Sequence, residues 1–377
     1  MAIGIKLNIY VFHLQLTRVK IICLISNSSN NVSGKGVANL IISLPKLSLL
    51  MCEPYLLREG IKYVHSINVN SLTYQLVYLH TRFPDRDFLM SATSLCPNIK
   101  ELVIEDQGRD CAEALTRMKS LQCLTLENYT WHNRDEKFYE ECFSNLTKLV
   151  LKNPKMIGID VEFLEKLGEW CQTLKSLTIT LYHRDIFTRV YKFRNGRFFP
   201  NLDSLTIDGD VSLSMIETLL TSAGEGKLKS LTIYIHQLGI PSGAFDVMML
   251  RMARDGFLAN LENLQCFQWE VSLETMLFII DQCPKLRHIW GLDLLMLSPQ
   301  SITAIQQHIT NNNRNIDLHD GMSTSEDRSS KGIPFLSERS KRRVEVADQA
   351  IDDDHADQLA LVGERAFEDI LREVSLL

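Results

Sequence analysis

The sequence predicts an α/β solenoid, a horseshoe in which short parallel strands form the concave sheet and helices cover the outer side. Three observations lead to this fold. A short apolar phrase recurs along the chain, most of its copies start 22 to 28 residues apart, and the segments between them have the periodicity of amphipathic helices. The 377 residues are 45% apolar, an ordinary share for a soluble protein, and suffice for one elongated domain.

The phrase places apolar residues, usually leucine, at its first, fourth and sixth positions. Because the fourth and sixth residues are two apart, they point to the same face of a short strand. A single unit cannot bury that face, but stacked units bury it against one another. Clear copies begin at Ile99, Leu121, Leu146, Leu174, Leu202 and Leu228, weaker copies at Leu44, Val64, Leu261 and Leu286, and a closing strand is expected at 316–318.

The segments between the copies are expected to form helices of about ten residues. Apolar side chains follow steps of three and four residues over 160–170, 215–220, 245–252 and 273–280, and Ser212 or Ser214 is suited to cap the second of these helices. The long gaps from Val64 to Ile99 and from Leu228 to Leu261 are expected to hold longer helices or loops. Alternating strands and helices at this spacing identify the larger type of leucine-rich repeat.

Several copies of the phrase are preceded by the same kind of residue. Cys96, Cys171 and Cys283 stand three positions before the phrase, and Phe143 and Phe199 take this place in two other copies. This arrangement resembles the cysteine-containing leucine-rich repeats of F-box proteins, and the resemblance covers about residues 40–318. Many unrelated binding proteins share the repeat, so it is more specific for the fold than for the function.

The resemblance implies the substrate-recognition subunit of a multi-subunit ubiquitin ligase, with an N-terminal F-box that binds the adaptor. No F-box is recognisable over residues 1–43. Leu44-Pro45 resembles the Leu-Pro that opens the F-box motif, but the residues after it continue as a copy of the repeat. No adaptor-binding residue is therefore carried over. Three explanations stay open: the F-box has been lost, the sequence is truncated, or the chain is a different repeat protein.

The chain is expected to divide into four parts. Residues 1–39 form an apolar segment of uncertain structure, 40–318 the repeat domain, 319–343 a flexible linker and 344–377 an amphipathic helix that docks on the solenoid or on a partner. Charged residues such as Lys6 and Arg18 interrupt the first apolar stretch, which argues against a membrane span or signal peptide. The nine cysteines form no C-x-x-C pair, which favours reduced thiols in the cytoplasm, or in the nucleus.

No constellation for catalysis, a metal or a cofactor emerges from the sequence. The ten histidines are dispersed, and none pairs with Glu or Cys at zinc-ligand spacing. Gly226-Lys227 lacks the Ser or Thr that a phosphate-binding loop needs, because Leu228 follows. The net charge of −6 gives no indication of nucleic-acid binding. We therefore expect no enzyme, no cofactor, and no nucleic-acid or membrane partner.

The residues that flank the buried positions of each strand are expected to point from the concave face toward a protein partner. They are charged in the early repeats, small and hydroxylated in the middle, and aromatic in the late repeats. Clustered exposed aromatic residues often anchor protein interfaces. The alternative is that Phe267 and Trp290 pack beneath the C-terminal tail as an internal cap, because terminal repeats need to be covered. The predicted binding residues are Glu101, Glu105, Glu127, Lys148, Lys152, Tyr234, Phe267, His288 and Trp290.

The sequence thus favours a protein-binding repeat module, with substrate recognition in a ubiquitin ligase as the first hypothesis. A general interaction scaffold without a ligase role is the alternative. A secreted recognition protein is the third, and it would require a signal peptide and disulfide-linked caps.

Overall fold

The computed structural model describes residues 21–23, 33–43, 49–51, 54–66, 76–82, 84–105, 111–129, 136–153, 161–181, 198–209, 211–224, 226–235, 243–267, 271–291 and 297–319. The predicted C-terminal helix, the predicted linker beyond His319 and most of the first 32 residues lie outside this set. None of the helices in the described ranges combines the length and the apolar character needed to cross a lipid bilayer.

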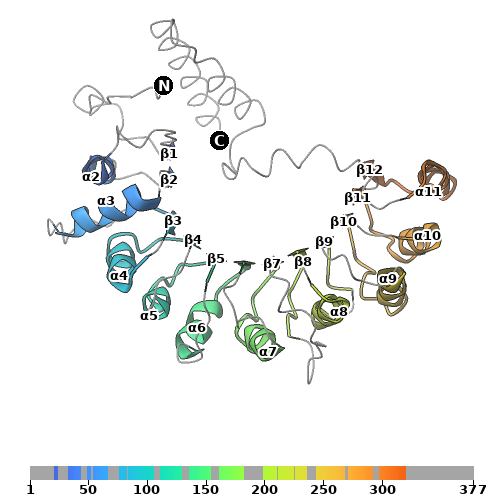
Figure 1. Cartoon of the computed structure of the whole chain (residues 1–377), viewed down its shortest axis with the longest axis horizontal. Helices are drawn as coiled ribbons and strands as arrows, with labels where there is room; N and C mark the ends of the chain where they lie inside the picture. The colour runs from blue at the N-terminus through green and yellow to red at the C-terminus, as the bar shows by residue number, and fades with distance from the viewer. Residues whose placement is uncertain are drawn as a thin grey trace, which may run out of the picture.

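The protein is a curved leucine-rich-repeat solenoid, with the strands on the inside of the arc and the helices on the outside (Figure 1). One sheet contains ten strands, and every neighbouring pair is parallel and consecutive in the sequence. The strands are β3 (Tyr78–Arg82), β4 (Glu101–Glu105), β5 (Cys123–Glu127), β6 (Lys148–Lys152), β7 (Ser176–Leu181), β8 (Ser204–Gly209), β9 (Ser230–Ile235), β10 (Asn263–Phe267), β11 (His288–Trp290) and β12 (Asp317–His319).

Helices connect successive strands and cover the outer side of the sheet, except between β7 and β8, where most of the connection lies outside the described residues (Figure 1). They are α4 (Arg86–Leu95), α5 (Ala112–Thr116), α6 (Glu136–Phe143), α7 (Val161–Trp170), α8 (Leu213–Ser222), α9 (Ala244–Arg254), α10 (Leu273–Gln282) and α11 (Pro299–Asn311). Before them come α2 (Gly34–Ser43), α3 (Pro54–Ser66) and a two-stranded parallel sheet of β1 (Ile21–Cys23) and β2 (Leu49–Met51).

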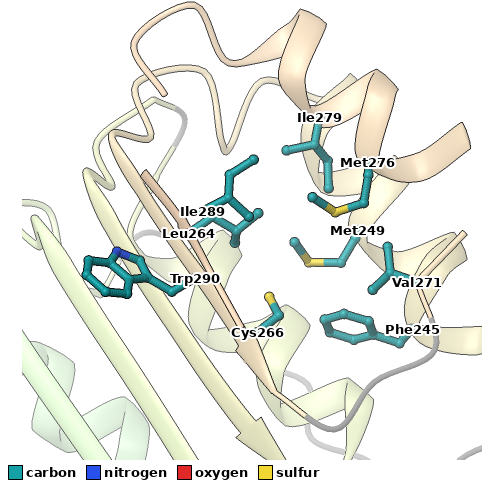
Figure 2. A pocket seen from close by; sticks show the side chains of 9 residues that line it. All are labelled: Phe245, Met249, Leu264, Cys266, Val271, Met276, Ile279, Ile289 and Trp290. Carbon is teal, nitrogen blue, oxygen red and sulfur yellow. The ribbon is translucent and has the colours of Figure 1, made fainter. Parts of the chain in front are cut away.

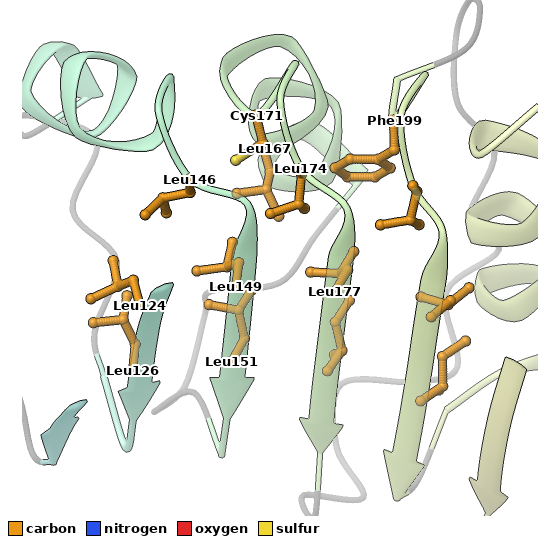
Figure 3. Packing of buried hydrophobic residues seen from close by; sticks show 14 of the residues in the cluster. Leu124, Leu126, Leu146, Leu149, Leu151, Leu167, Cys171, Leu174, Leu177 and Phe199 are labelled. Carbon is orange, nitrogen blue, oxygen red and sulfur yellow. The ribbon is translucent and has the colours of Figure 1, made fainter. Parts of the chain in front are cut away.

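The recurring phrase forms the core, as predicted. In each clear copy, from Ile99 to the copy that begins at Leu228, the three apolar residues are at most 2% exposed. Figure 3 shows leucines of successive repeats, such as Leu124, Leu149 and Leu177, stacked at the same level between the sheet and the helices. Each repeat buries its apolar face against the next one, which is what a single repeat cannot do alone.

The residue three positions before the phrase belongs to a tight turn between helix and strand. The carbonyl of Cys171 accepts a hydrogen bond from the amide of Leu174 at 3.1 Å, and Cys283 and Leu286 form the same bond at 3.0 Å. Proline suits the second position of such turns, where Pro97, Pro200 and Pro284 occur. The side chains of the turn-opening residues Cys96, Phe143, Cys171, Phe199 and Cys283 are all buried, so this position supports packing.

The predicted helices are confirmed within a few residues of their expected bounds. Ser212 is the N-cap of α8, and its hydroxyl accepts a hydrogen bond from the amide of Met215 at 3.3 Å. Ser272 caps α10 and Ser298 caps α11 in the same way. The predicted closing strand is β12, which pairs with β11.

One predicted copy of the phrase is wrong. Val64 does not open a strand, because it lies in α3, fully buried on the same helical face as Leu57 and Ile61. The repeat at this place begins instead at Leu76, where Leu79 and Thr81 occupy the two buried strand positions of β3. This copy does not match the apolar phrase, because its sixth position holds the polar residue Thr81. The copy predicted at Leu44 is described only from Leu49, the first residue of β2.

Candidate protein-binding face

The pairing of the strands aligns the outward-pointing side chains of the concave face into rows that run along the arc. Alternation along each strand sends every second residue to this face, and the register places equivalent residues next to one another. The middle row consists of His80, Val103, Thr125, Val150, Thr178, Thr206, Thr232, Gln265, Trp290 and His319. The predicted binding residues in the described strands all belong to this row or to the rows on either side of it.

At the N-terminal end of the face, three of the five predicted charged residues, Glu105, Glu127 and Lys152, pair across neighbouring strands. Glu105 accepts a hydrogen bond from His80 at 2.8 Å and lies 3.8 Å from the guanidinium of Arg82. Lys152 lies 3.6 Å from Glu127 on the neighbouring strand. Such cross-strand pairs reduce the net field that this end presents to a partner.

The other two charged residues at this end flank a cysteine. In register, Cys123 pairs with Glu101 on one side and with Lys148 on the other. Burial and then the charge of Glu101 raise the pKa of the Cys123 thiol, and Lys148 partly opposes this change. Burial, followed by the charges of Glu101 and Glu105, raises the pKa of Tyr78 to about 12. Both groups therefore stay neutral at physiological pH.

The middle of the face carries small hydroxyl side chains. Strands β7, β8 and β9 present serine in one row and threonine in the next, from Ser176 and Thr178 to Ser230 and Thr232. The hydroxyl of Thr232 donates to the side-chain carbonyl of Gln265 at 3.2 Å. Hydroxyls can donate and accept, so this stretch suits uncharged polar groups such as peptide amides.

At the C-terminal end, one predicted binding residue proves to be buried. Phe267 lies on the concave side of β10, but it is only 3% exposed. Its ring lies 5.3 Å from that of Tyr234, and it packs so tightly under Gly291 that a Cβ there would lie 2.8 Å from the ring. Phe267 is therefore covered by its neighbours, and its role on this face is packing against Tyr234 and Gly291, not exposed contact with a partner.

Trp290 and His288 are half-buried on the concave side of β11. The indole of Trp290 stacks on the imidazole of His319 in β12, with ring centroids 3.7 Å apart and planes inclined by 12°. Figure 2 shows Trp290 on the opposite side of the strand from the apolar side chains of the core. The register also pairs His288 with Asp317. Asp317 and His319 are not among the predicted binding residues, although two polar residues spaced two apart in the closing strand indicate a shared face.

A small apolar cavity lies behind this part of the sheet, in the core between β10, β11 and the helices α9 and α10 (Figure 2). Its lining includes Phe245, Met249, Met276 and Ile279. Methionine side chains fill irregular spaces well, and the lining is apolar apart from the thiol of Cys266 and the indole of Trp290, which points away from the cavity in Figure 2. We assign this cavity to packing.

The described cysteines outside the two-stranded sheet are free thiols. Burial raises the pKa of Cys96, Cys142, Cys266 and Cys283 to about 12, and it also raises that of Cys171. These groups are therefore protonated and unreactive at neutral pH, as expected of core residues.

No protein-family model and no curated protein matches the chain. Three solved structures with which it can be superposed are the Rad7–Elc1 complex of yeast, an internalin of Listeria monocytogenes and a protein of Bacteroides fragilis. The matching chain of the yeast complex has 16% sequence identity to this protein, with 77% of each chain covered and a TM-score of 0.39. The internalin is 13% identical, with 82% of this chain and 83% of the other covered and a TM-score of 0.39.

The Bacteroides protein is also 13% identical, with 55% of this chain and 66% of that chain covered and a TM-score of 0.31. Superpositions this loose carry no information about partners. The assignment of the fold, a leucine-rich-repeat solenoid, follows from the ten parallel strands and their outer helices.

Proposed function

We propose that the chain is a protein-recognition module that holds a partner polypeptide on its concave face. The observation that carries this proposal is the unbroken series of aligned outward side chains over ten strands, which ends in half-buried aromatic and imidazole rings. Tyr234 and Trp290 supply the type of side chain that contributes most to protein interfaces. The serines and threonines between them and the charged end provide hydrogen-bonding groups for a peptide backbone.

The charges of the face support a polypeptide over a nucleic acid. A nucleic-acid site needs a basic stripe to neutralise phosphates. Among the outward residues of the ten described strands, three are basic (Arg82, Lys148 and Lys152) and five are acidic (Glu101, Glu105, Glu127, Asp208 and Asp317). The partner is therefore expected to present a mostly neutral polar segment with one apolar or aromatic side chain for the C-terminal end.

Selection from a random peptide library, followed by affinity measurements on the selected peptides, tests this proposal. Trp290→Ala should weaken a selected peptide by about tenfold or more, the loss of about 1.4 kcal/mol or more that is typical of a strong interface residue. Tyr55→Ala and Val247→Ala are matched controls, because both remove exposed apolar side chains elsewhere on the surface, 46% and 66% exposed. A library that yields no binder, or binders that are insensitive to Trp290 and Tyr234, would contradict the proposal.

The ligase role is the narrower form of the same proposal. The resemblance to F-box repeat proteins supports it through the cysteine or phenylalanine that opens each turn before a strand. Because these side chains are buried, they support the assignment of the repeat type only. Attachment to a ligase depends on an adaptor-binding segment, which is not recognised in the sequence. Co-purification of the full chain with the ligase adaptor would support this role. If this chain and any longer form of it bind peptides but not the adaptor, the ligase role is contradicted and the alternative, a general interaction scaffold, is supported.

A further inference from the structure

The closing strand places two imidazoles and a carboxylate next to one another at the C-terminal end of the concave face. Nδ1 of His288 lies 3.4 Å from Nε2 of His319 and 3.4 Å from Oδ2 of Asp317. The ligand atoms of the three residues all lie within 4.8 Å of one another. No other group of three or more such side chains occurs in the described part of the chain.

These separations fit ligands around a common centre better than hydrogen bonds. A protein N–H···O bond is usually about 2.9–3.0 Å long, so both 3.4 Å separations are long for direct bonds. Ligands about 2.0–2.1 Å from a tetrahedral Zn²⁺ are about 3.3–3.4 Å apart, the length of the edge of that tetrahedron. Two of the three separations therefore have the length that a shared zinc ion requires.

We infer that His288, Asp317 and His319 form a binding site for one divalent transition-metal ion, for which Zn²⁺ is the best match. Two imidazoles and one carboxylate are ligands that zinc prefers, whereas Ca²⁺ and Mg²⁺ require sets made mostly of oxygen. Three protein ligands leave the fourth position of a tetrahedral ion to water or to a side chain of another molecule. This inference is independent of the proposed function, because metal binding at this site does not require that the concave face bind a protein.

The fold holds the ligands in place from two adjacent strands. Asp317 and His319 are two apart in β12 and therefore share a face, and the parallel register sets Asp317 opposite His288 and His319 opposite Trp290. The stack with Trp290 fixes the plane of the His319 ring. The amide of Gly291 donates to the carbonyl of His319 at 3.0 Å, which ties the end of β12 to β11.

The site is accessible, and the nearby thiols do not compete for the ion. The side chains of His288 and Asp317 are 36% and 65% exposed, so an ion can enter from solvent. Cys266 and Cys283 are at most 4% exposed, so their thiols lie in the core, away from the site, and burial raises the pKa of both to about 12. The expected ligands are thus nitrogen and oxygen alone.

Calorimetric titration of the full, chelator-treated chain with Zn²⁺ tests the inference. One ion per chain should bind, and Mg²⁺ or Ca²⁺ should not displace it. Loss of an outer-shell partner alone weakens metal binding about 10–100-fold, so His288→Ala and His319→Ala should weaken it by at least about tenfold. His308→Ala is the matched control, because His308 also pairs with an aspartate, Asp281 at 2.7 Å, but lacks a second imidazole. It should bind Zn²⁺ like the unmodified chain.

Titration with Co²⁺ gives a second readout that does not depend on heat. Bound Co²⁺ should show the visible bands of a tetrahedral ion with nitrogen and oxygen ligands, without the charge-transfer absorption of thiolates, and it should quench the fluorescence of Trp290. Trp290→Phe should remove that quenching and retain binding. Circular dichroism confirms that each variant is folded. Absence of binding to the unmodified chain, or equal binding by the His288→Ala/His319→Ala double variant, would overturn the inference.

Discussion

The two ends of the concave face are built from different interactions. At the N-terminal end, Glu105 pairs with His80 and Arg82, and Lys152 with Glu127, so charges meet across neighbouring strands. At the C-terminal end, rings meet across strands: Tyr234 packs on Phe267, and Trp290 stacks on His319. Exposed ion pairs are individually weak and are screened by salt, whereas apolar contacts are not. The two ends should therefore respond to different perturbations.

The helices behind the two ends are joined by polar contacts of different kinds. Asp85, the N-cap of α4, binds Arg58 at 2.7 Å and Lys62 at 3.0 Å, so charges join α3 to α4. Behind the C-terminal end, the guanidinium of Arg314 donates to the carbonyls of Ile280 and Cys283, at 2.9 and 2.6 Å, at the end of α10. A cation at a helix C-terminus satisfies orphan carbonyls and interacts favourably with the helix dipole.

Replacement of Phe267 should show the largest effect on the C-terminal end. Phe267→Ala empties a buried site and is expected to destabilise the protein by about 3–5 kcal/mol. Trp290→Ala, the matched control, removes a larger but half-buried ring and should be less destabilising. Unfolding by denaturant, with hydrogen exchange to locate the change, measures both. Equal losses of stability would show that Trp290 is as much a core residue as Phe267.

Gly291 tests how tightly the same end is packed. Its φ of +82° is unfavourable for other residues, and a Cβ would lie 2.8 Å from the Phe267 ring. Gly291→Ala should therefore cost about 2–5 kcal/mol, the sum of backbone strain and overpacking. Gly243 has a φ of +80° with nothing within 4 Å of its Cβ position, so Gly243→Ala isolates the backbone strain of about 1–2 kcal/mol. Similar thermal shifts for the two variants would argue against tight packing over Phe267.

Asp85 tests the charged end. Burial alone would raise the pKa of its carboxyl, but the amide of Phe88 and the cations Lys62 and Arg58 outweigh burial and hold the pKa below its usual value of 3.8. Its stabilising contribution is therefore present above about pH 4 and is lost as the pH falls below the usual value, through the lowered pKa of the folded protein. Asp85→Ala should cost about 1–2 kcal/mol at neutral pH, the value of a lost N-cap.

Asp85→Asn separates the cap from the charge, because an amide oxygen can still accept from Phe88. It should lose less stability than the alanine variant, and its unfolding free energy should fall less between pH 5 and pH 3 than that of the unmodified chain. An identical decline with pH in both proteins would show that the Asp85 pairs do not stabilise the N-terminal end.

The sequence was sufficient for the fold because the buried positions repeat. A leucine in the phrase has the same environment in each copy, so periodicity alone predicts the strands from β4 onward. The contacts across the face are harder to predict. His288 and His319 lie 31 residues apart, and only the register of two strands brings their rings together. Alternation placed Phe267 on the concave side, but it does not indicate what covers a side chain there.

The smallest effect is expected at the charged end, in the copy of the phrase that begins at Leu76 and was predicted at Val64. Thr81 occupies a core position of β3, fully buried, and its hydroxyl has no hydrogen-bond partner. A buried hydroxyl without a partner is unfavourable, so Thr81→Val should stabilise the protein by about 1 kcal/mol. Thr125→Val is the control, because the same exchange on the outward side of β5 should change stability little. Destabilisation by Thr81→Val would show that the hydroxyl is satisfied, and that the N-terminal end of the sheet depends on polar contacts inside the core as well as on its surface.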